Sequence, residues 1–253
     1  MISGDLLTIL APSFAAGLII LSTHVVLGRQ VLARGIVFMD LAVAQIAAMG
    51  AVIAHLFSYD LVYASLSLNK VLPYLFSIAG AAVISYMSSH CEKELEAIIG
   101  CIYVVAAASI LLLLSSDPHG AEQVAKTLNG SILWLNWHEL VLPAIFSALF
   151  LAVVLINQRV LGSKLFYPLF AILVTLSVEM VGVYLVFSSL IMPALAIDRM
   201  QEKKELIHGY LLGAAGYLSG LTLSSLYDLP GGAAIVIALA LICWSYRILR
   251  GRR

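Results

Sequence analysis

The chain has 253 residues, of which 62% are hydrophobic and 11% are charged, and its formal net charge is zero. A soluble globular protein is about half apolar and about a quarter charged. This composition, with a mean hydropathy of +1.04, therefore indicates a membrane protein. A net charge of zero gives no electrostatic reason to expect a nucleic-acid partner. The three cysteines, Cys91, Cys101 and Cys243, stand singly and predict neither a disulfide framework nor a CxxC metal site.

Charged and turn-rich points divide the chain into nine apolar segments. A membrane-spanning helix needs about 20 residues, so these crossings leave no room for a separate soluble domain. We expect residues 1–253 to form a single transmembrane domain in the lipid bilayer, with an all-α polytopic fold. The first segment has no basic leading region and no small-residue cleavage site, so it is expected to be a retained span. The nine segments are 6–28, 36–57, 71–90, 97–116, 139–157, 165–181, 182–197, 206–227 and 231–249.

The distribution of Lys and Arg indicates how the continuous apolar run 165–197 crosses the membrane. If it forms two short passes hinged near Gly182, twelve of the fourteen basic residues lie on one side, and only Lys70 and Lys126 lie on the other. If it forms one pass, the split is five against nine. Because basic residues concentrate in cytoplasmic loops, the sequence predicts two passes, an outside N-terminus and a cytoplasmic C-terminus. The twelve are Arg29, Arg34, Lys93, Arg159, Lys164, Arg199, Lys203, Lys204, Arg247, Arg250, Arg252 and Arg253.

The sequence lacks the catalytic motifs of common soluble enzymes. It contains no GxxxxGK[ST] phosphate loop, so this chain is not expected to hydrolyse ATP in the P-loop manner. It also lacks GxSxG and HExxH motifs, and its six histidines fall in six different segments or loops. The pattern favours transport. An intramembrane enzyme or scaffold that uses Asp40 and Glu179 is a distant alternative.

Four polar side chains fall inside the apolar segments. An ionisable group near the bilayer centre costs about 2.5–3.5 kcal/mol on insertion scales, so each one calls for an explanation. Asp40, Gln45, Glu179 and His24 are candidates to line a translocation path. The structural alternatives are a cap or a salt bridge to Arg34 for Asp40, an interfacial carboxylate for Glu179, and a hydrogen bond to a backbone carbonyl for His24.

The stretch that follows Gly182 is typical of a broken helix. Ser188, Ser189 and Pro193 loosen a helical backbone, and neighbouring groups must then satisfy the freed carbonyls. Broken helices line the pathway in many transporters. We therefore predict a hinge built from Gly182 and Pro193.

Two further patterns are open to more than one interpretation. The loop 117–138 is amphipathic and carries Trp134 and Trp137, which suit the headgroup level, so it could cap the bundle or dock a partner. Small residues at helical spacing in 206–227 allow close helix packing, either within one subunit or between two subunits. These residues are Gly209, Gly213, Gly216 and Gly220.

Four stretches, in the same order along the chain, resemble the zinc/manganese-type ABC transporter permeases. They are VVLGRQVLARGIVFMDLA (25–42), VAKTLNGSILWLNWHEL (124–140), VGVYLVFSSLIMPALAI (181–197) and SLYDLPGGAAIVIALALI (225–242). The resemblance implies a type II ABC importer-like permease in the bacterial inner membrane. It also implies a homodimer, a cytoplasmic ABC ATPase dimer that binds the ATP, and an extracytoplasmic solute-binding protein. The expected substrate is zinc, followed by manganese or iron, and no cofactor is expected on this chain. A metal chelate or another small solute is the alternative.

The chain departs from the family pattern at the position of the expected metal ligands. Relatives carry Gly-Asp-x-x-x-His in the second segment, which places a carboxylate and an imidazole one turn apart. Here Asp40 matches the aspartate, but the histidine position holds Ala44 or, counted back from Gly50, Gln45. The resemblance supports a metal ligand at Asp40, and we hypothesise that Glu179 replaces the missing one.

A second departure concerns the contact with the ATPase. Relatives carry a cytoplasmic docking stretch of about twenty residues before the sixth segment, whereas this chain has only NQRVLGSKLF (157–166). Arg159, Gly162 and Lys164 are therefore the candidates for ATPase coupling. The loop 198–208 is the alternative, although a solvated basic loop is the simpler interpretation of it.

Overall fold

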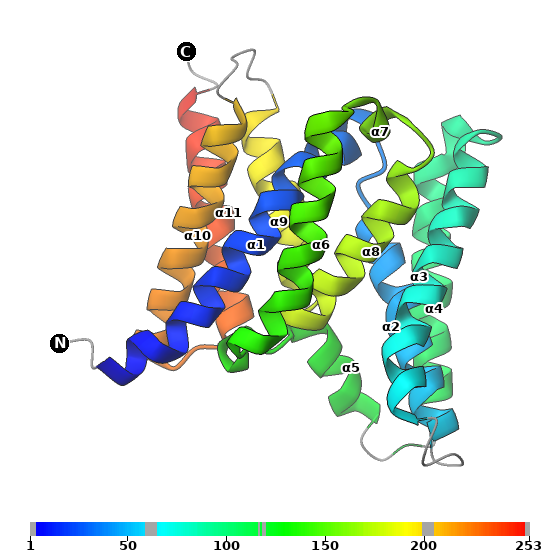
Figure 1. The fold of residues 1–253 in the computed structure, drawn as a ribbon, viewed down its shortest axis with the longest axis horizontal. Helices are drawn as coiled ribbons and strands as arrows, with labels where there is room; N and C mark the ends of the chain where they lie inside the picture. Colours follow the sequence, from blue (N-terminus) through cyan, green and yellow to red (C-terminus); the bar gives the residue numbers. More distant parts are fainter. Residues whose placement is uncertain (1–3, 59–64, 116, 118–119, 199–204, 251–253) are drawn as a thin grey trace. The chain divides into compact units, whose positions relative to one another are not determined.

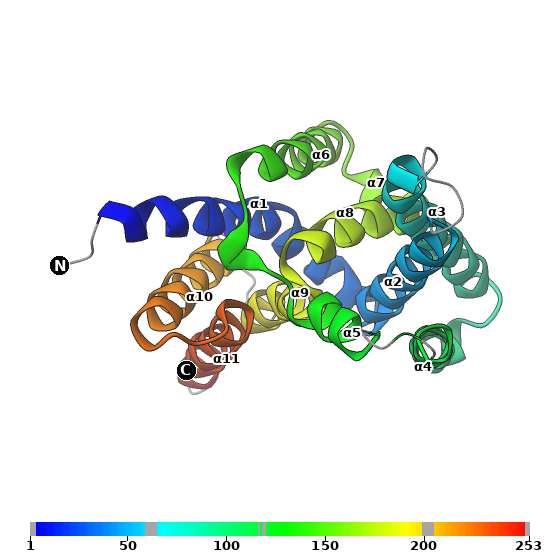
Figure 2. The same ribbon diagram turned by 90° about the horizontal axis from the view of Figure 1, so that it is seen from below.

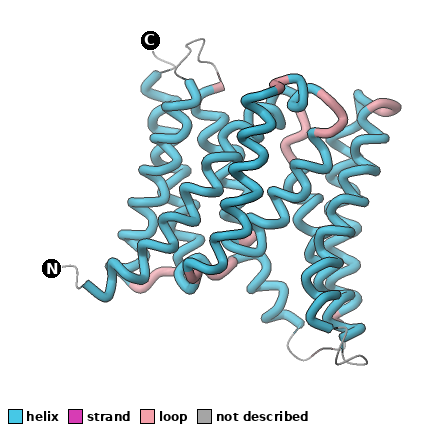
Figure 3. The backbone as a smooth tube through the Cα atoms, in the orientation of Figure 1, coloured by secondary structure: helices cyan, strands magenta, loops and turns pink. Residues whose placement is uncertain are grey.

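The computed structural model describes residues 4–58, 65–115, 117, 120–198 and 205–250. Helices and short connections account for all of these described residues, and no strand is present among them (Figure 3). The predicted all-helical fold class is confirmed.

Each of the nine apolar segments corresponds to a helix. Seven of these helices are long and apolar enough to cross a membrane, so the chain is polytopic. The seven are α1 (Gly4–Arg34), α2 (Met39–Ser58), α3 (Ser65–Ser88), α4 (Leu95–Leu113), α6 (Trp137–Ile156), α10 (Glu205–Tyr227) and α11 (Gly231–Arg250). The other two, α8 (Phe166–Val181) and α9 (Val183–Ile197), are apolar but shorter. That they cross as two short passes, which gives nine crossings in all, stays a prediction.

Short helices occupy the two loops that the sequence singled out. Within 117–138, the structure has α5 (Gly120–Asn129) and the 3-10 helix η2 (Ile132–Trp134). The predicted coupling stretch contains α7 (Arg159–Gly162), and a second 3-10 helix, η1 (Glu92–Glu94), precedes α4.

The predicted hinge is present at Gly182, where α8 ends and α9 begins (Figure 1). Gly182 has a φ of 80°, in the left-handed region that side-chain-bearing residues rarely adopt. Its backbone packs against Gly130, which has a φ of 65°, and a Cβ on either glycine would lie less than 3.0 Å from backbone atoms of the other. The break therefore depends on two glycines, one from each side of the contact. Pro193, the other residue of the predicted hinge, lies inside α9, and its part in a hinge stays a prediction.

The chain forms two compact units, which we describe one at a time. Unit 1 comprises residues 1–34, 128–153 and 177–253. In it α1, α9, α10 and α11 pack side by side, and η2 contacts α1 and α11 (Figure 2). The four glycines of α10 are buried in this packing. Added Cβ atoms would meet Val25 and Leu21 of α1 from Gly209 and Gly213, and Leu239 and Ile235 of α11 from Gly216 and Gly220. The small-residue stripe therefore serves packing within the subunit.

The basic side chains of unit 1 gather at one end. Arg29 of α1 forms an ion pair with Glu205 at the start of α10. Arg247 of α11 donates a hydrogen bond to the carbonyl of Leu195, near the end of α9. These contacts agree with a shared side for the basic residues of α1 and α11. Five other residues of the predicted cytoplasmic set lie outside the described residues: Arg199, Lys203, Lys204, Arg252 and Arg253.

Unit 2 comprises residues 35–127 and 154–176. Here α2 packs against both α3 and α4. Gly50 of α2 lies against Leu72 and Phe76 of α3, and Ile46 of α2 lies against Gly80 of α3. These close approaches hold α2 firmly on one side, and α2 carries two of the predicted pathway residues.

Candidate functional site

Asp40 lies in the first turn of α2 and is 1% exposed. Its Oδ1 atom has no hydrogen-bond partner among the described residues. A buried carboxylate oxygen without a donor is costly, so such an atom points to a role that ordinary packing does not supply. Acidic groups are also favoured in the first turn by the helix dipole, which explains how α2 tolerates Asp40 there. Oδ1 is therefore the atom of Asp40 that the described structure leaves without a hydrogen bond.

Gln45 is also buried in α2, but it lies on a different face. At 3.6 residues per turn, five residues rotate the side chain by about 140° from Asp40, whereas four residues rotate it by about 40°. The position one turn after Asp40 is therefore Ala44, which offers no ligand atom. The departure from the family motif is thus a departure in geometry as well as in sequence.

Glu96 is a residue that the sequence did not single out. Its Oε1 accepts a hydrogen bond from the backbone N–H of Phe38 at 3.1 Å, although α4 and the start of α2 are 58 positions apart. The first turn of a helix leaves its backbone N–H groups without helical partners, so Glu96 acts as a cap supplied by a neighbouring helix. It interacts electrostatically with Asp40, and its Oε2 is buried without a hydrogen-bond partner among the described residues. The only sequence signal was an acid immediately before the apolar segment 97–116.

His24 is fully buried in α1 of unit 1. Its Nδ1 lies 3.2 Å from the hydroxyl of Thr23, while its Nε2 has no partner among the described residues. The Thr23 hydroxyl also donates to the carbonyl of Ile20 at 3.1 Å. One ring nitrogen is thus held in place, and the other remains available to a ligand.

Glu179 lies in the last turn of α8, three residues before Gly182, and its side chain is exposed. This placement agrees with the interfacial carboxylate that the sequence left open, and it does not test a pathway role. Asp40 and Gln45 belong to unit 2, whereas Glu179 and His24 belong to unit 1. Among the described residues, no group of three His, Cys, Asp or Glu side chains could hold a metal ion.

The polar residues of α9 are bonded within unit 1. Ser189 donates its hydroxyl to the carbonyl of Leu185 at 2.6 Å, so the hydroxyl of Tyr217, 2.7 Å away, must be the donor to Ser189. The Tyr217 ring fits against Gly17 of α1. Because Pro193 has no N–H, it cannot bond the carbonyl of Ser189 one turn earlier. Pro193 therefore interrupts the backbone hydrogen bonds of α9, and a side-chain hydrogen bond from Tyr217 of α10 holds the helix at this point.

The coupling candidates Arg159, Gly162 and Lys164 are all exposed around α7. The side chain of Asn157 accepts the N–H of Arg159 at 3.1 Å, and the hydroxyl of Ser163 accepts the N–H of Leu165 at 3.2 Å. The short helix is thus bounded by a side-chain acceptor at each end. Arg159 and Lys164 are therefore accessible to a partner that contacts α7.

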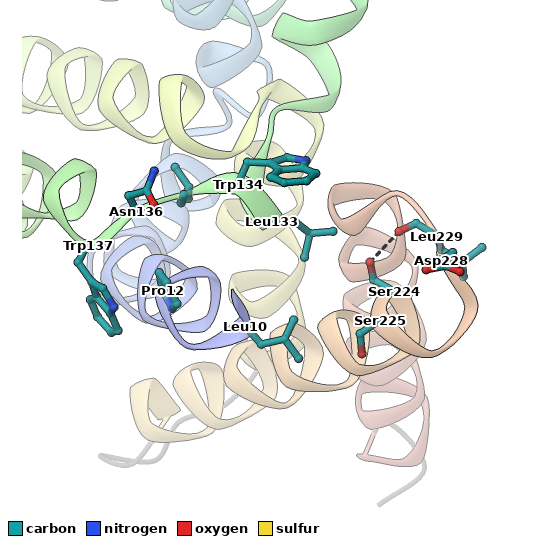
Figure 4. A pocket seen from close by; sticks show the side chains of 11 residues that line it. Leu10, Pro12, Leu133, Trp134, Asn136, Trp137, Ser224, Ser225, Asp228 and Leu229 are labelled. Carbon is teal, nitrogen blue, oxygen red and sulfur yellow. Dashed lines mark hydrogen bonds between the residues drawn. The ribbon is translucent and has the colours of Figure 1, made fainter. Parts of the chain in front are cut away.

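Unit 1 also contains a cavity of about 510 Å³ (Figure 4). It lies by the start of α1 and the end of α10, whereas the Arg29–Glu205 ion pair joins the later part of α1 to the start of α10. Its walls come from the start of α1, from η2 with the residues that follow it, and from the turn between α10 and α11. In unit 2 a groove between α2 and α4 is lined by Met49 and Cys101 among others, and neither Asp40 nor Gln45 lines it. Neither space contains the predicted pathway residues.

A family model described as the ABC 3 transport family matches residues 7–171 and 160–248 of the chain. The chain belongs to this family. The family is that of the zinc/manganese-type ABC permeases, which confirms the predicted resemblance. As the membrane component of a transporter, this ABC 3 permease is not an enzyme by itself.

Comparison with solved structures supports the same fold. A chain of PsaBC from Streptococcus pneumoniae, solved in complex with Fab, superposes with a TM-score of 0.72 at 16% sequence identity. The match covers 97% of this ABC 3 permease and 95% of the other chain, so the shared fold extends over nearly the whole of both chains. No curated protein sequence matches the chain.

Proposed function

We propose that this metal-type ABC importer permease carries zinc across the inner membrane, with manganese and iron as the next candidates. The family match over nearly the whole chain supports a permease. The observation that supports a cation as cargo is the buried Oδ1 of Asp40, which has no donor among the described residues. We infer that Asp40 contacts the ion and that Glu179 and His24 act elsewhere along its path.

The partners follow from this function. The chain has no phosphate loop, so ATP is hydrolysed by a separate ABC ATPase dimer that docks on α7 through Arg159 and Lys164, with Gly162 ending the helix. Two copies of the permease form the translocation path between them, and a solute-binding protein delivers the cargo from outside. The N-terminus lies outside and the C-terminal tail lies in the cytoplasm, since basic residues favour the cytoplasmic side.

A metal chelate is the second candidate cargo, and the geometry of α2 favours it. Ala44 occupies the position one turn after Asp40, and Gln45 lies on another face of the helix. A cargo that brings its own ligands needs fewer ligands from the protein. One acidic contact at Asp40 would then orient the chelate without replacing its ligands.

The test is ATPase activity of the purified complex with its binding protein, stimulated by zinc, manganese, iron or their chelates. Asp40→Asn keeps the size of the side chain and removes its charge, so we expect at least about a tenfold rise in the metal concentration needed for stimulation, as for loss of a metal-site contact. Glu92→Gln, at an exposed carboxylate, is the matched control and is expected to behave like the parent.

Three results would count against the proposal. Stimulation by a chelate but by no free ion would replace the metal ion with the chelate as cargo. Unchanged metal uptake in both Asp40→Ala and Glu179→Ala would remove both residues from the path. A complex that no cation or chelate stimulates, although it assembles and hydrolyses ATP, would point to another small solute.

A further inference from the structure

The cavity in unit 1 lies where three apolar helices begin or end. Helix α6 begins at Trp137, α10 ends at Tyr227 and α11 begins at Gly231, and each of these helices is long and apolar enough to span a membrane. The cavity opens between these ends and the start of α1 (Figure 4). Its surroundings are therefore the boundary between the acyl chains and the lipid headgroups.

The lining of the cavity combines apolar and polar side chains. Leu10, Leu133, Leu229 and Trp134 contribute apolar surface, and Asn136 and Asp228 contribute polar groups. Trp134 is 84% exposed and Trp137 is 58% exposed. Exposed tryptophans at the end of a span are typical of side chains that lie at headgroup level. An occupant of this cavity must combine an apolar body with a polar end.

The charge of the lining residues determines which polar group of a ligand the cavity can bind. Asp228 supplies a carboxylate, and no Lys or Arg occurs among the lining residues that the structure describes. Asp228 has a φ of 50°, and the turn that carries it is closed by the hydroxyl of Ser224, which donates to the carbonyl of Leu229 at 2.7 Å. The carboxylate is therefore presented on an ordered turn, where it attracts a cationic group and repels an anionic one.

We propose that this cavity binds one phospholipid whose headgroup carries a primary ammonium group. The ammonium lies at the carboxylate of Asp228, and one acyl chain lies against Leu10, Leu133 and Trp134. The side-chain amide of Asn136, which also lines the cavity, is the donor for the phosphate. This site is separate from the translocation path and does not depend on the identity of the cargo.

The experiment uses the full chain in complex with its partners, in bilayers where one phospholipid has brominated acyl chains. Trp137→Phe and Trp244→Phe leave Trp134 as the only tryptophan, because the chain has three. We expect brominated phosphatidylethanolamine to quench Trp134 fluorescence half-maximally at about a fivefold lower fraction than brominated phosphatidylglycerol, as expected for one charge at a membrane surface.

Asp228→Asn is expected to abolish this difference between the two lipids. Asparagine tolerates a positive φ well, so the turn should keep its shape and the protein should fold. Glu122→Gln, at an exposed carboxylate that does not line the cavity, is the matched control and should keep the parent's preference.

Equal quenching by the two lipids in the parent overturns the proposal, and so does a preference that survives in Asp228→Asn. If neither lipid quenches Trp134 while the solute-binding protein shields it from acrylamide, the cavity is a protein-docking surface and the lipid assignment is wrong. Metal-stimulated ATPase activity is expected to be the same whichever of these results is found. A failure of the lipid proposal can therefore be told apart from a failure of the proposed function.

Discussion

At the scale of single residues, the neighbours of a side chain determine what it can do. Asp40 and Glu96 are both acids early in an apolar helix, and each has one buried oxygen without a hydrogen-bond partner among the described residues. They differ in what else they bond, because Oε1 of Glu96 accepts the N–H of Phe38 and so stabilises the start of α2 from a neighbouring helix. The two residues should respond differently to the loss of charge.

Glu96→Leu removes the acceptor for the N–H of Phe38, whereas Glu96→Gln keeps a carbonyl oxygen in its place. Loss of a helix cap costs about 1 kcal/mol, so Glu96→Leu should unfold at a lower temperature and Glu96→Gln should stay close to the parent. Thermal unfolding of the purified permease, followed by circular dichroism, measures the difference. Equal melting temperatures for the two variants would show that the hydrogen bond does not stabilise α2.

Gly28 lies at a close approach between α1 and α9. A Cβ at this position would lie less than 3.0 Å from the carbonyl oxygen of Leu190 and from the side chain of Ala194. We expect Gly28→Ala to destabilise unit 1 by about 1–3 kcal/mol, the usual cost of overpacking. Gly100→Ala is the control, because nothing lies within 4 Å of the added methyl and alanine favours the helix. The same melting experiment compares them, and a stable Gly28→Ala would contradict the close approach.

At the scale of elements, the break between α8 and α9 is the most specific feature. It combines a positive φ at Gly182 with backbone contact to Gly130, which comes from the loop between α5 and η2. Beyond the break, Pro193 interrupts the backbone hydrogen bonds of α9, and the Tyr217–Ser189 hydrogen bond supports the helix there. The break is therefore built from two distant stretches of the chain, and changes on either side should affect it.

Gly182→Ala should prevent α8 and α9 from meeting in this geometry. The left-handed backbone costs a residue with a side chain about 1–2 kcal/mol, and the added Cβ also collides with Gly130. We expect lower metal uptake and a lower melting temperature than for Gly100→Ala, measured on the same preparations. Parent-like uptake in Gly182→Ala would mean that transport does not need this break.

At the scale of the whole molecule, the number of crossings decides which loops meet which partners. Two short passes through α8 and α9 place the turn that carries Asp228 outside, whereas one pass places it in the cytoplasm. In unit 1 the ion pair of Arg29 with Glu205 and the bond from Arg247 to Leu195 gather basic residues at the other end. The positive-inside rule then predicts that this end faces the cytoplasm.

Cysteine labelling tests this orientation in a variant that lacks Cys91, Cys101 and Cys243. We expect Asp228→Cys to react with a membrane-impermeant maleimide added to intact cells, and Lys93→Cys to react only after the membrane is opened. Glu122→Cys is the outside control, because its side depends only on the first four segments. Labelling of Glu122→Cys but not of Asp228→Cys in intact cells would mean that residues 165–197 cross once.

The sequence alone determined the membrane class, the segments and the hinge, since length, hydropathy and glycine placement are local properties of the chain. The nine apolar segments all form helices, and Gly182 separates α8 from α9 where the charge distribution had placed the hinge. Only the tertiary structure showed that Glu96 caps α2 and that Gly130 is the partner of Gly182, because these contacts join residues 58 and 52 positions apart. It also assigned the glycine stripe of α10 to packing within the subunit, since the same spacing suits any close helix neighbour.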